Sequence, residues 1–268
     1  MKIWLMGIIL LVSRGLQAAS PPVIPKDLMQ AVQPVSAQEE MKIGRDVAAN
    51  VAAQFGLSTD ESLAEYVNLV GLTVAQFAPK QDVPYRFAVL NSGILNAFAA
   101  PGGYIFITQG LLSQLKDEAQ LACVLGHEIA HVSQRHVIKE IQKSRMVDAA
   151  IPGYAKAQAQ KAQWMKQVTD LAVQMLWKGL SREDELEADR LGVEYASKAG
   201  YDPSSFKEVL EILKARAQEP DYLKEVKFLL STHPKPEERL RSIEERLKAL
   251  PGGEREAERF KSGTQPQK

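Results

Sequence analysis

Apolar residues recur at helical spacing in the first third of the chain. Residues 39–55 repeat apolar side chains every three or four positions and end near Gly56, which predicts a helix. Residues 58–60, Ser-Thr-Asp, can cap a second helix that continues to Pro79. Four prolines lie in residues 20–38 and forbid a continuous helix there, so this segment is expected to be a Pro-rich linker.

The apolar pattern then changes to a period of two. Residues 85–90 alternate well enough to form a strand. Residues 94–100 and 104–108 are expected to pair as a hairpin across the Pro-Gly-Gly of residues 101–103. A small sheet, or hairpin, therefore precedes the next helix.

The rest of the chain has mainly helical patterns. A helix is predicted from near Ser113 to beyond His136, and another is expected to begin at Ser181. An amphipathic stripe over residues 168–176 predicts a helix packed on the domain, although a lid or membrane-surface helix stays open as an alternative. A charged helix is expected over residues 237–250. The pattern predicts a mainly helical α+β fold.

The central predicted helix contains the motif His-Glu-x-x-His. His127 and His131 lie one turn apart on the same helix face, so both can bind one metal ion. Glu128 is rotated by about 100° from His127 and is the candidate general base for a metal-activated water. Gly126 and Ala130 are small enough to let a strand and a metal approach closely. The alternative is a buried helix with two hydrogen-bonded core histidines.

An acidic segment at residues 181–190 can complete the metal site, because zinc held by two histidines needs a third protein ligand. Glu185 and Asp189 are four residues apart and share a helix face, so one can bind the metal while the other holds a ligand histidine. Glu183 and Glu187 are expected to point elsewhere. A solvated acidic helix start is the alternative.

Two further residues near the motif could be mistaken for ligands. His136 comes one residue too early for the class of zinc proteases whose third ligand follows a helix-ending glycine, and Gln134 replaces that glycine. On a continuous helix His136 would point about 140° away from His131, so it is assigned to the surface or to a position behind the ligands. Cys123 is the only cysteine and is interpreted as packed core.

These motifs, in this order, resemble a known family. Residues 127–131, His-Glu-Ile-Ala-His, and residues 185–189, Glu-Leu-Glu-Ala-Asp, are similar to the gluzincin metallopeptidases that include HtpX, the CAAX prenyl endopeptidase and the periplasmic BepA-like proteases. The likeness is greatest to the soluble BepA-like members. It extends to residues 96–103 and 231–234 and covers roughly residues 39–247.

The resemblance implies a zincin-like metallopeptidase fold with one zinc ion per chain. It implies Glu185 as the third ligand and Asp189 as the hydrogen-bond partner of a zinc histidine. It also implies that His233 can occupy the open position of the zinc and keep the enzyme latent. Taken from the residues alone, His233 could equally be a turn residue before a helix.

The predicted hairpin is a candidate substrate-binding element. A strand edge can orient an extended polypeptide through main-chain hydrogen bonds while it reads few side chains. We assign this role to Asn96, Ala97, Phe98 and Ala99. The alternative is an ordinary sheet that covers the core.

Composition bounds the remaining possibilities. The chain of 268 residues suits one sizeable domain, placed at residues 39–250, and its 33 basic and 33 acidic residues indicate no nucleic acid partner. Residues 1–19 resemble a secretory signal peptide, although Arg14 leaves a retained anchor open. No later stretch is long and apolar enough to span a membrane. Residues 251–268 are expected to be a disordered tail.

The sequence therefore predicts a periplasmic, exported zinc endopeptidase that cleaves unfolded or extended polypeptides. The resemblance adds a role in quality control of misfolded envelope proteins, and peripheral association with the membrane stays open. Two alternatives remain. One is a chaperone-like binding protein with a structural zinc, and the other is a zinc amidohydrolase that acts on small molecules or cell-wall peptides. The oligomeric state does not follow from the residues.

Overall fold

The computed structural model describes residues 33–79, 82–149, 161–216, 233 and 236–265. The expected signal peptide and most of the expected linker lie outside these residues. Among the described residues, no helix combines the length and the apolar character that crossing a bilayer requires.

A three-stranded mixed sheet lies at the centre of the fold. Its strands are β1 (Arg86–Leu90), β2 (Ala97–Ala100) and β3 (Tyr104–Thr108), in the order β1-β3-β2. Strands β2 and β3 form the expected antiparallel hairpin across a short turn, η1 (Pro101–Gly103). Strand β1 pairs parallel with β3. This order makes β2 an edge strand of the sheet.

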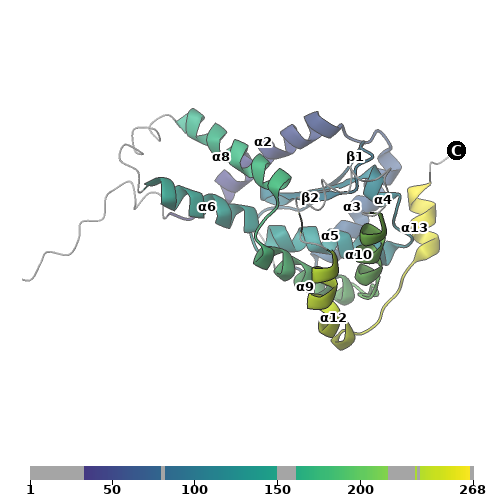
Figure 1. Ribbon diagram of the computed structural model, residues 1–268. Helices are drawn as coiled ribbons and strands as arrows, with labels where there is room; N and C mark the ends of the chain where they lie inside the picture. The colour runs from purple at the N-terminus through teal and green to yellow at the C-terminus, as the bar shows by residue number, and fades with distance from the viewer. Residues whose placement is uncertain (1–32, 80–81, 150–160, 217–232, 234–235, 266–268) are drawn as a thin grey trace, which may run out of the picture.

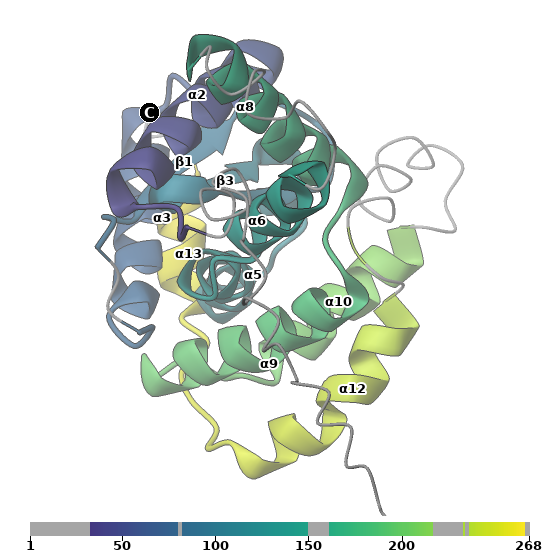
Figure 2. The same cartoon turned by 90° about the vertical axis from the view of Figure 1, so that its left-hand side faces the viewer.

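Helices cover both faces of the sheet, so the predicted mainly helical fold with a small sheet is confirmed (Figure 1). Helices α2, α8 and α6 lie on one side of the sheet, and α5 lies on the other side with α9 beneath it. Figure 2 shows the same layers after a quarter turn. The helices are α2 (Ala37–Phe55), α3 (Glu61–Ala75), α4 (Gln109–Leu112), α5 (Glu118–Ser133), α6 (His136–Ala149), α8 (Lys161–Lys178), α9 (Arg182–Lys198), α10 (Ser205–Arg216), α12 (Pro236–Ala249) and α13 (Ala257–Thr264).

The alternation of side chains along β2 divides the core into two apolar clusters. Ala97 and Ala99 face the cluster that contains the apolar residues of α3, α5 and α9. Phe98 and Ala100 face the cluster formed with α2, α6 and α8. The apolar stripe of α8 is buried in this second cluster, as expected for a helix that packs on the domain.

The expected continuous helix from Ser113 to beyond His136 is wrong. The segment forms two helices, α5, which begins only at Glu118, and α6, because Arg135 adopts left-handed backbone with φ 55° between them. The Arg135 guanidinium holds this turn through hydrogen bonds to Glu40 (2.8 Å) and to the carbonyl of Val35 (2.8 Å). An ion pair to a distant helix is invisible to local helical periodicity, so the sequence pattern missed the break.

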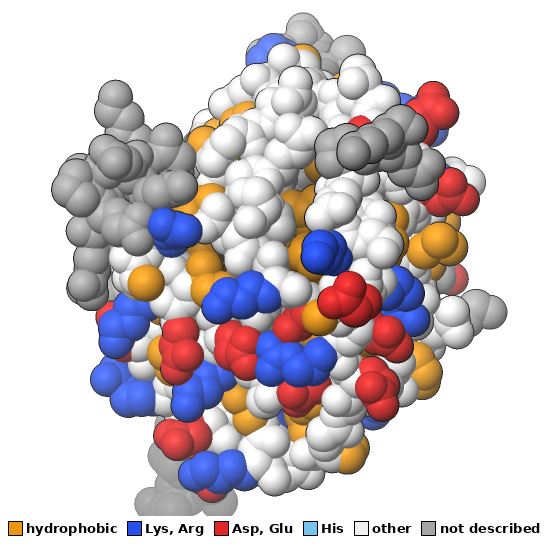
Figure 3. Space-filling view, turned by 90° about the vertical axis from the view of Figure 1, so that its right-hand side faces the viewer, with side chains coloured by type: hydrophobic (Ala, Val, Ile, Leu, Met, Phe, Trp, Pro, Cys, Tyr) orange, Lys and Arg blue, Asp and Glu red, His pale blue; other side chains and the backbone are white. Residues whose placement is uncertain are grey.

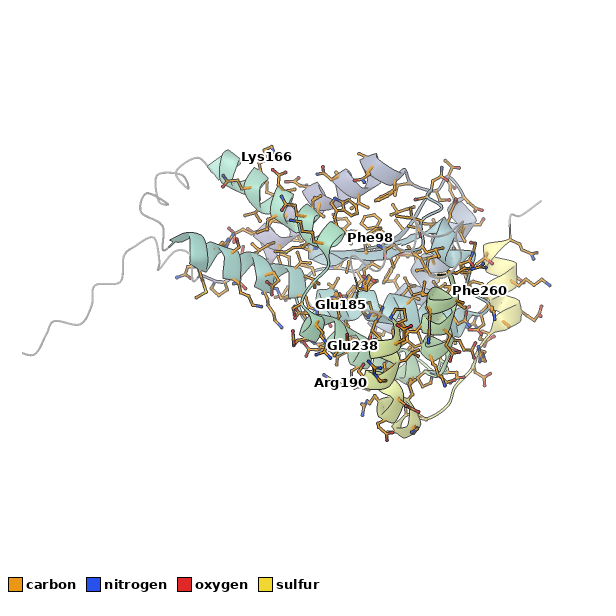
Figure 4. All side chains as sticks on the ribbon, viewed as in Figure 1. Phe98, Lys166, Glu185, Arg190, Glu238 and Phe260 are labelled. Carbon is orange, nitrogen blue, oxygen red and sulfur yellow. The ribbon has the colours of Figure 1, made fainter. Side chains whose placement is uncertain are left out.

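The expected disorder of the C-terminal tail is also wrong for residues 251–265. Helix α13 buries Phe260, which Figure 4 shows on the side of the helix that faces the rest of the molecule. Arg255 pairs with Asp117, and Arg259 pairs with Glu118. Two arginines and one aromatic residue therefore attach this segment to the domain, against its polar composition. Figure 3 shows the side of the molecule nearest α13, with basic and acidic side chains intermixed.

Candidate metal centre

Two helices supply the candidate ligands. Helix α5 begins after Asp117, whose side chain caps it by accepting a hydrogen bond from the backbone of Gln120 (2.9 Å), and it carries His127 and His131 one turn apart. Helix α9 begins after Ser181, whose hydroxyl caps it, and carries Glu185 in its first turn. Figure 4 shows Glu185 at the start of α9, below the sheet.

The donor atoms of these residues form one cluster. Nε2 of His127 lies 3.0 Å from Nε2 of His131 and 3.6 Å from Oε2 of Glu185. Nε2 of His131 lies 3.5 Å from Oε1 of Glu185. A tetrahedral zinc ion with bonds of about 2.0 to 2.1 Å places its ligand atoms roughly 3.4 Å apart. The two imidazoles and the carboxylate therefore fit a zinc ion.

An acidic residue one turn further along α9 holds the first histidine from behind. Oδ1 of Asp189 lies 2.8 Å from Nδ1 of His127, which leaves Nε2 of that ring for a metal. Asp189 is itself paired with Arg239 of α12 through hydrogen bonds of 2.8 and 2.5 Å. Burial alone would raise the pKa of Asp189, but the Arg239 charge outweighs it and lowers the pKa. Sequence reasoning missed Arg239, because no local pattern marks it.

Glu128 lies beside the cluster and is buried, with 3% of its surface exposed. Burial raises the pKa of its carboxyl, and the nearby Glu185 charge adds to the increase, while His127 opposes it. Glu128 lines two pockets, one on each side of the metal cluster, and both pockets also contain Ala97 and His233. The carboxyl group is thus placed between the donor atoms and the open space beside β2.

His233 also reaches the cluster. Its Nδ1 lies 2.6 Å from Oε2 of Glu185, and its side chain is 11% exposed. Burial alone would lower the pKa of His233, but the Glu185 carboxylate outweighs burial and raises the pKa. The ligand atoms of His127, His131, Glu185 and His233 all lie within 4.8 Å of one another. The structure therefore brings His233 to His127, although more than 100 positions separate these two residues in the sequence.

His136 is not a surface residue. Its ring is fully buried, and its Nδ1 lies 2.9 Å from Nδ1 of His131. Its other nitrogen, Nε2, lies 3.2 Å from Oε2 of Glu187. Glu187 does point away from the metal donors, as expected, but its target is this histidine. The left-handed Arg135 turns His136 back toward the site, which a continuous helix could not do.

The expected substrate-binding residues divide into two groups. The Nδ2 of Asn96 is buried and has no hydrogen-bond partner among the described residues, and Asn96 and Ala97 line the same pocket as Glu128. Phe98 and Ala99 line the second pocket together with Glu128, and Phe98 also stacks on Phe55 with ring centroids 5.8 Å apart, in the layer of α2 and α8. The structure thus places the Phe98 ring mainly in the core.

Gly126 allows close approach of a different element from the one expected. A Cβ atom at this position would lie 2.5 Å from the carbonyl oxygen of Gly192 on α9. The neighbour at Gly126 is therefore a helix and not a strand. Cys123 is buried, and its Sγ lies 3.9 Å from the carbonyl oxygen of Asp202, in agreement with packed core.

The fold and the donor set define a metallopeptidase site of the His-Glu-x-x-His type with a glutamate third ligand. The sequence model of peptidase family M48 matches residues 61–247, and the chain belongs to this family.

Named relatives agree with this membership. The chain is 28% identical over 242 residues to the Beta-barrel assembly-enhancing protease of Escherichia coli (strain K12), which covers 87% of this chain and 49% of that protein. It is 30% identical to the protein of Vibrio cholerae named "Putative beta-barrel assembly-enhancing protease", over 72% of this chain and 40% of that protein. It is also 30% identical to the Mitochondrial metalloendopeptidase OMA1 of Schizosaccharomyces pombe, over 80% of this chain and 62% of that protein. The chain spans about half the length of the first of these relatives.

Proposed function

We propose that this chain is a zinc-dependent endopeptidase that cleaves extended or unfolded polypeptides. The observation that carries the proposal is the position of Glu128, which lines both pockets beside β2 and lies next to the cluster of His127, His131 and Glu185. A structural metal site has no use for a buried carboxyl with a raised pKa at its open side.

The residues divide the chemistry among themselves. A zinc ion held by His127, His131 and Glu185 would polarise the scissile carbonyl and a water molecule. Glu128 would accept a proton from the attacking water and deliver it to the leaving amine, a role that suits a carboxyl whose pKa is raised by burial. Asp189 holds His127 in the orientation that directs Nε2 to the metal.

The edge strand would align the substrate. Within the part of the chain that the structure describes, strand β2 has one neighbour in the sheet, β3, so its other side can receive an extended chain through main-chain hydrogen bonds. The Nδ2 of Asn96, which has no hydrogen-bond partner in the described ranges, offers one more donor to a substrate carbonyl. Apolar side chains line the pockets on both sides of Glu128, which favours apolar substrate residues around the scissile bond. They include Leu111, Val124, Phe206, Val209 and Leu210 on one side and Val137, Met175, Leu176 and Leu180 on the other.

His233 would act as a latch. Its ring lies among the zinc ligands and lines both pockets, so it stands where the water and the scissile bond must enter. Removal of the ring would therefore open the site. A persistently closed site would instead favour a binding protein with a structural zinc.

The cellular role is the furthest step of the proposal. The relatives named for beta-barrel assembly support a task in envelope protein quality control, and the signal-like residues 1–19 support export to the periplasm. One zinc ion per chain is expected, at the cluster of two histidines and one glutamate that His233 also joins.

Cleavage of casein, an unfolded protein, tests the activity. The full chain is compared with Glu128→Gln and His233→Ala, and bound zinc is measured for each. We expect all three proteins to bind zinc, Glu128→Gln to lose about a hundredfold or more of the activity, and His233→Ala to gain activity. Zinc binding without cleavage by any of the three proteins would contradict the peptidase assignment.

A further inference from the structure

A line of hydrogen-bonded side chains leads from the second zinc histidine to the surface. Nδ1 of His131 and Nδ1 of His136 lie 2.9 Å apart, and both rings are buried. Nε2 of His136 lies 3.2 Å from Oε2 of Glu187 and 3.6 Å from Oδ1 of Asp184. The first zinc histidine has a carboxylate directly behind it, in Asp189. The second zinc histidine, His131, has the His136 imidazole behind it, and the carboxylates of Glu187 and Asp184 lie behind His136.

The proton positions along this line follow from hydrogen-bond chemistry. A His131 ring that binds zinc through Nε2 carries its proton on Nδ1. That proton can only be donated to Nδ1 of His136 if the latter is bare, so the proton of His136 sits on Nε2. A proton on Nε2 of His136 is then donated to Glu187, and Asp184 adds negative charge nearby. Each donor has an acceptor, so the arrangement satisfies every buried nitrogen of both rings.

The surrounding structure builds this arrangement from separate elements. His136 is the first residue of α6 and is aimed inward by the left-handed Arg135, which Glu40 holds. Glu187 and Asp184 come from the first turns of α9, the same helix that supplies Glu185. Helix α9 would therefore bind the zinc through Glu185, while Glu187 and Asp184 of the same helix support His131 through His136.

We propose that His136 is a positioning residue that keeps the proton of His131 on Nδ1, and thereby keeps Nε2 of His131 free for zinc, with Glu187 anchoring the far side of the His136 ring. The inference rests on the zinc site proposed above. It explains why His136 is buried behind His131 and why Glu187 contacts His136, neither of which follows from the set of zinc ligands alone.

Variants at position 136 separate this role from general packing. His136→Asn keeps an acceptor oxygen close to the place of Nδ1, whereas His136→Leu fills the site without an acceptor. We expect His136→Leu to weaken zinc binding by about ten- to a hundredfold in competition with a chromophoric chelator. His136→Asn should restore most of that affinity. Equal zinc affinity in both variants and the parent chain overturns the proposal.

The matched pair on α9 tests the far end of the line. Glu187→Gln removes the charge that anchors His136, while Glu183→Gln makes the same change at an exposed position one turn earlier in the same helix. Weaker zinc binding is expected only in Glu187→Gln. The same loss in both variants would reveal a general charge effect and would contradict a specific anchor.

Proton positions can be read directly in the metal-free protein. The chain has four histidines, so selective ¹⁵N-histidine labelling and long-range ¹H–¹⁵N correlation spectra can assign each tautomer. Well above the usual histidine pKa, His131 should carry its proton on Nδ1 in the parent chain and in His136→Asn, and should lose this preference in His136→Leu. A proton on Nε2 of His131 in the parent chain overturns the proposal even if His136→Leu fails to fold.

The outcomes also distinguish the inference from the function on which it rests. A parent chain that binds no zinc defeats the metal site itself, whereas normal zinc binding that does not depend on His136 defeats only the inference. A second zinc ion that disappears in His136→Asn would make His136 a ligand, together with Asp184 and Glu187, and would also overturn the positioning role.

Discussion

Gly126 of α5 touches Gly192 of α9, backbone against backbone. A Cβ atom on Gly126 would lie 2.5 Å from the carbonyl oxygen of Gly192, and a Cβ atom on Gly192 would lie 2.6 Å from the backbone nitrogen of His127. Real side chains do not tolerate such distances to backbone atoms. The absence of two side chains thus sets the separation of the helices that carry His127 and Glu185.

Substitution of either glycine should separate these helices. We expect Gly192→Ala to reduce the free energy of unfolding by about 1 to 3 kcal/mol and to weaken zinc binding, because Glu185 moves away from the histidines. Urea unfolding of the metal-free protein and chelator competition measure the two effects. Gly252→Ala is the control, since its Cβ would meet no atom within 4 Å. Normal zinc affinity in Gly192→Ala would show that the helix contact does not set the ligand geometry.

The contact of Asp189 with His127 predicts a loss of metal affinity on neutralisation. Asp189→Asn removes the charge that holds the ring and leaves the buried Arg239 without its carboxylate partner. We expect zinc binding to weaken by about ten- to a hundredfold and the metal-free protein to become less stable. Glu183→Gln, an exposed charge change on the same helix, should leave both quantities unchanged. The prediction fails if the two variants bind zinc equally well.

Because the backbone of Arg135 is left-handed, a glycine variant at this position should be more stable than an alanine variant, which is the reverse of the usual order in a helix. Both substitutions remove the ion pair with Glu40, but only glycine adopts φ 55° without steric cost. Arg135→Gly should therefore be more stable than Arg135→Ala by about 1 kcal/mol, as measured by urea unfolding. At the exposed Glu211 within α10 the usual order, with alanine the more stable, should hold. An unchanged order at position 135 would argue against the left-handed turn.

Glu118 predicts a specific dependence of stability on pH. Burial alone would raise the pKa of its carboxyl, but hydrogen bonds from Arg259, Tyr201 and Tyr66 outweigh burial and lower it. The stabilisation is therefore complete above the unfolded glutamate pKa of about 4.3 and is lost as the pH falls through the lower folded value. Glu118→Gln lacks this contribution.

The difference in unfolding free energy between the parent chain and Glu118→Gln should be largest above about pH 5 and should shrink below about pH 4. Urea unfolding of metal-free protein at constant ionic strength measures it. The exposed Glu211→Gln should give a difference that is small at every pH. A difference for Glu118→Gln that grows as the pH falls would mean that the folded pKa is raised and not lowered.

The sequence alone determined the features that depend on local periodicity and on fixed spacing. The helix over residues 39–55, the hairpin of β2 and β3, and the capped start of α9 follow from the order of apolar, turn and capping residues. His127 and His131 are brought together by one helical turn, so their proximity needed no tertiary structure. The family resemblance rests on these local motifs, and the family match confirms it.

Only the tertiary structure decided the features that depend on contacts between distant segments. Glu40 lies 95 residues before Arg135 and holds the turn that ends α5, and Glu118 lies 141 residues before Arg259 and fixes the tail that composition indicated as disordered. Arg239 behind Asp189 likewise became visible only in the fold, and the fold decided between the surface and a position behind the ligands for His136. Local periodicity reports which face of an element is apolar, whereas a long-range ion pair forms between single polar side chains and leaves no repeating pattern to read.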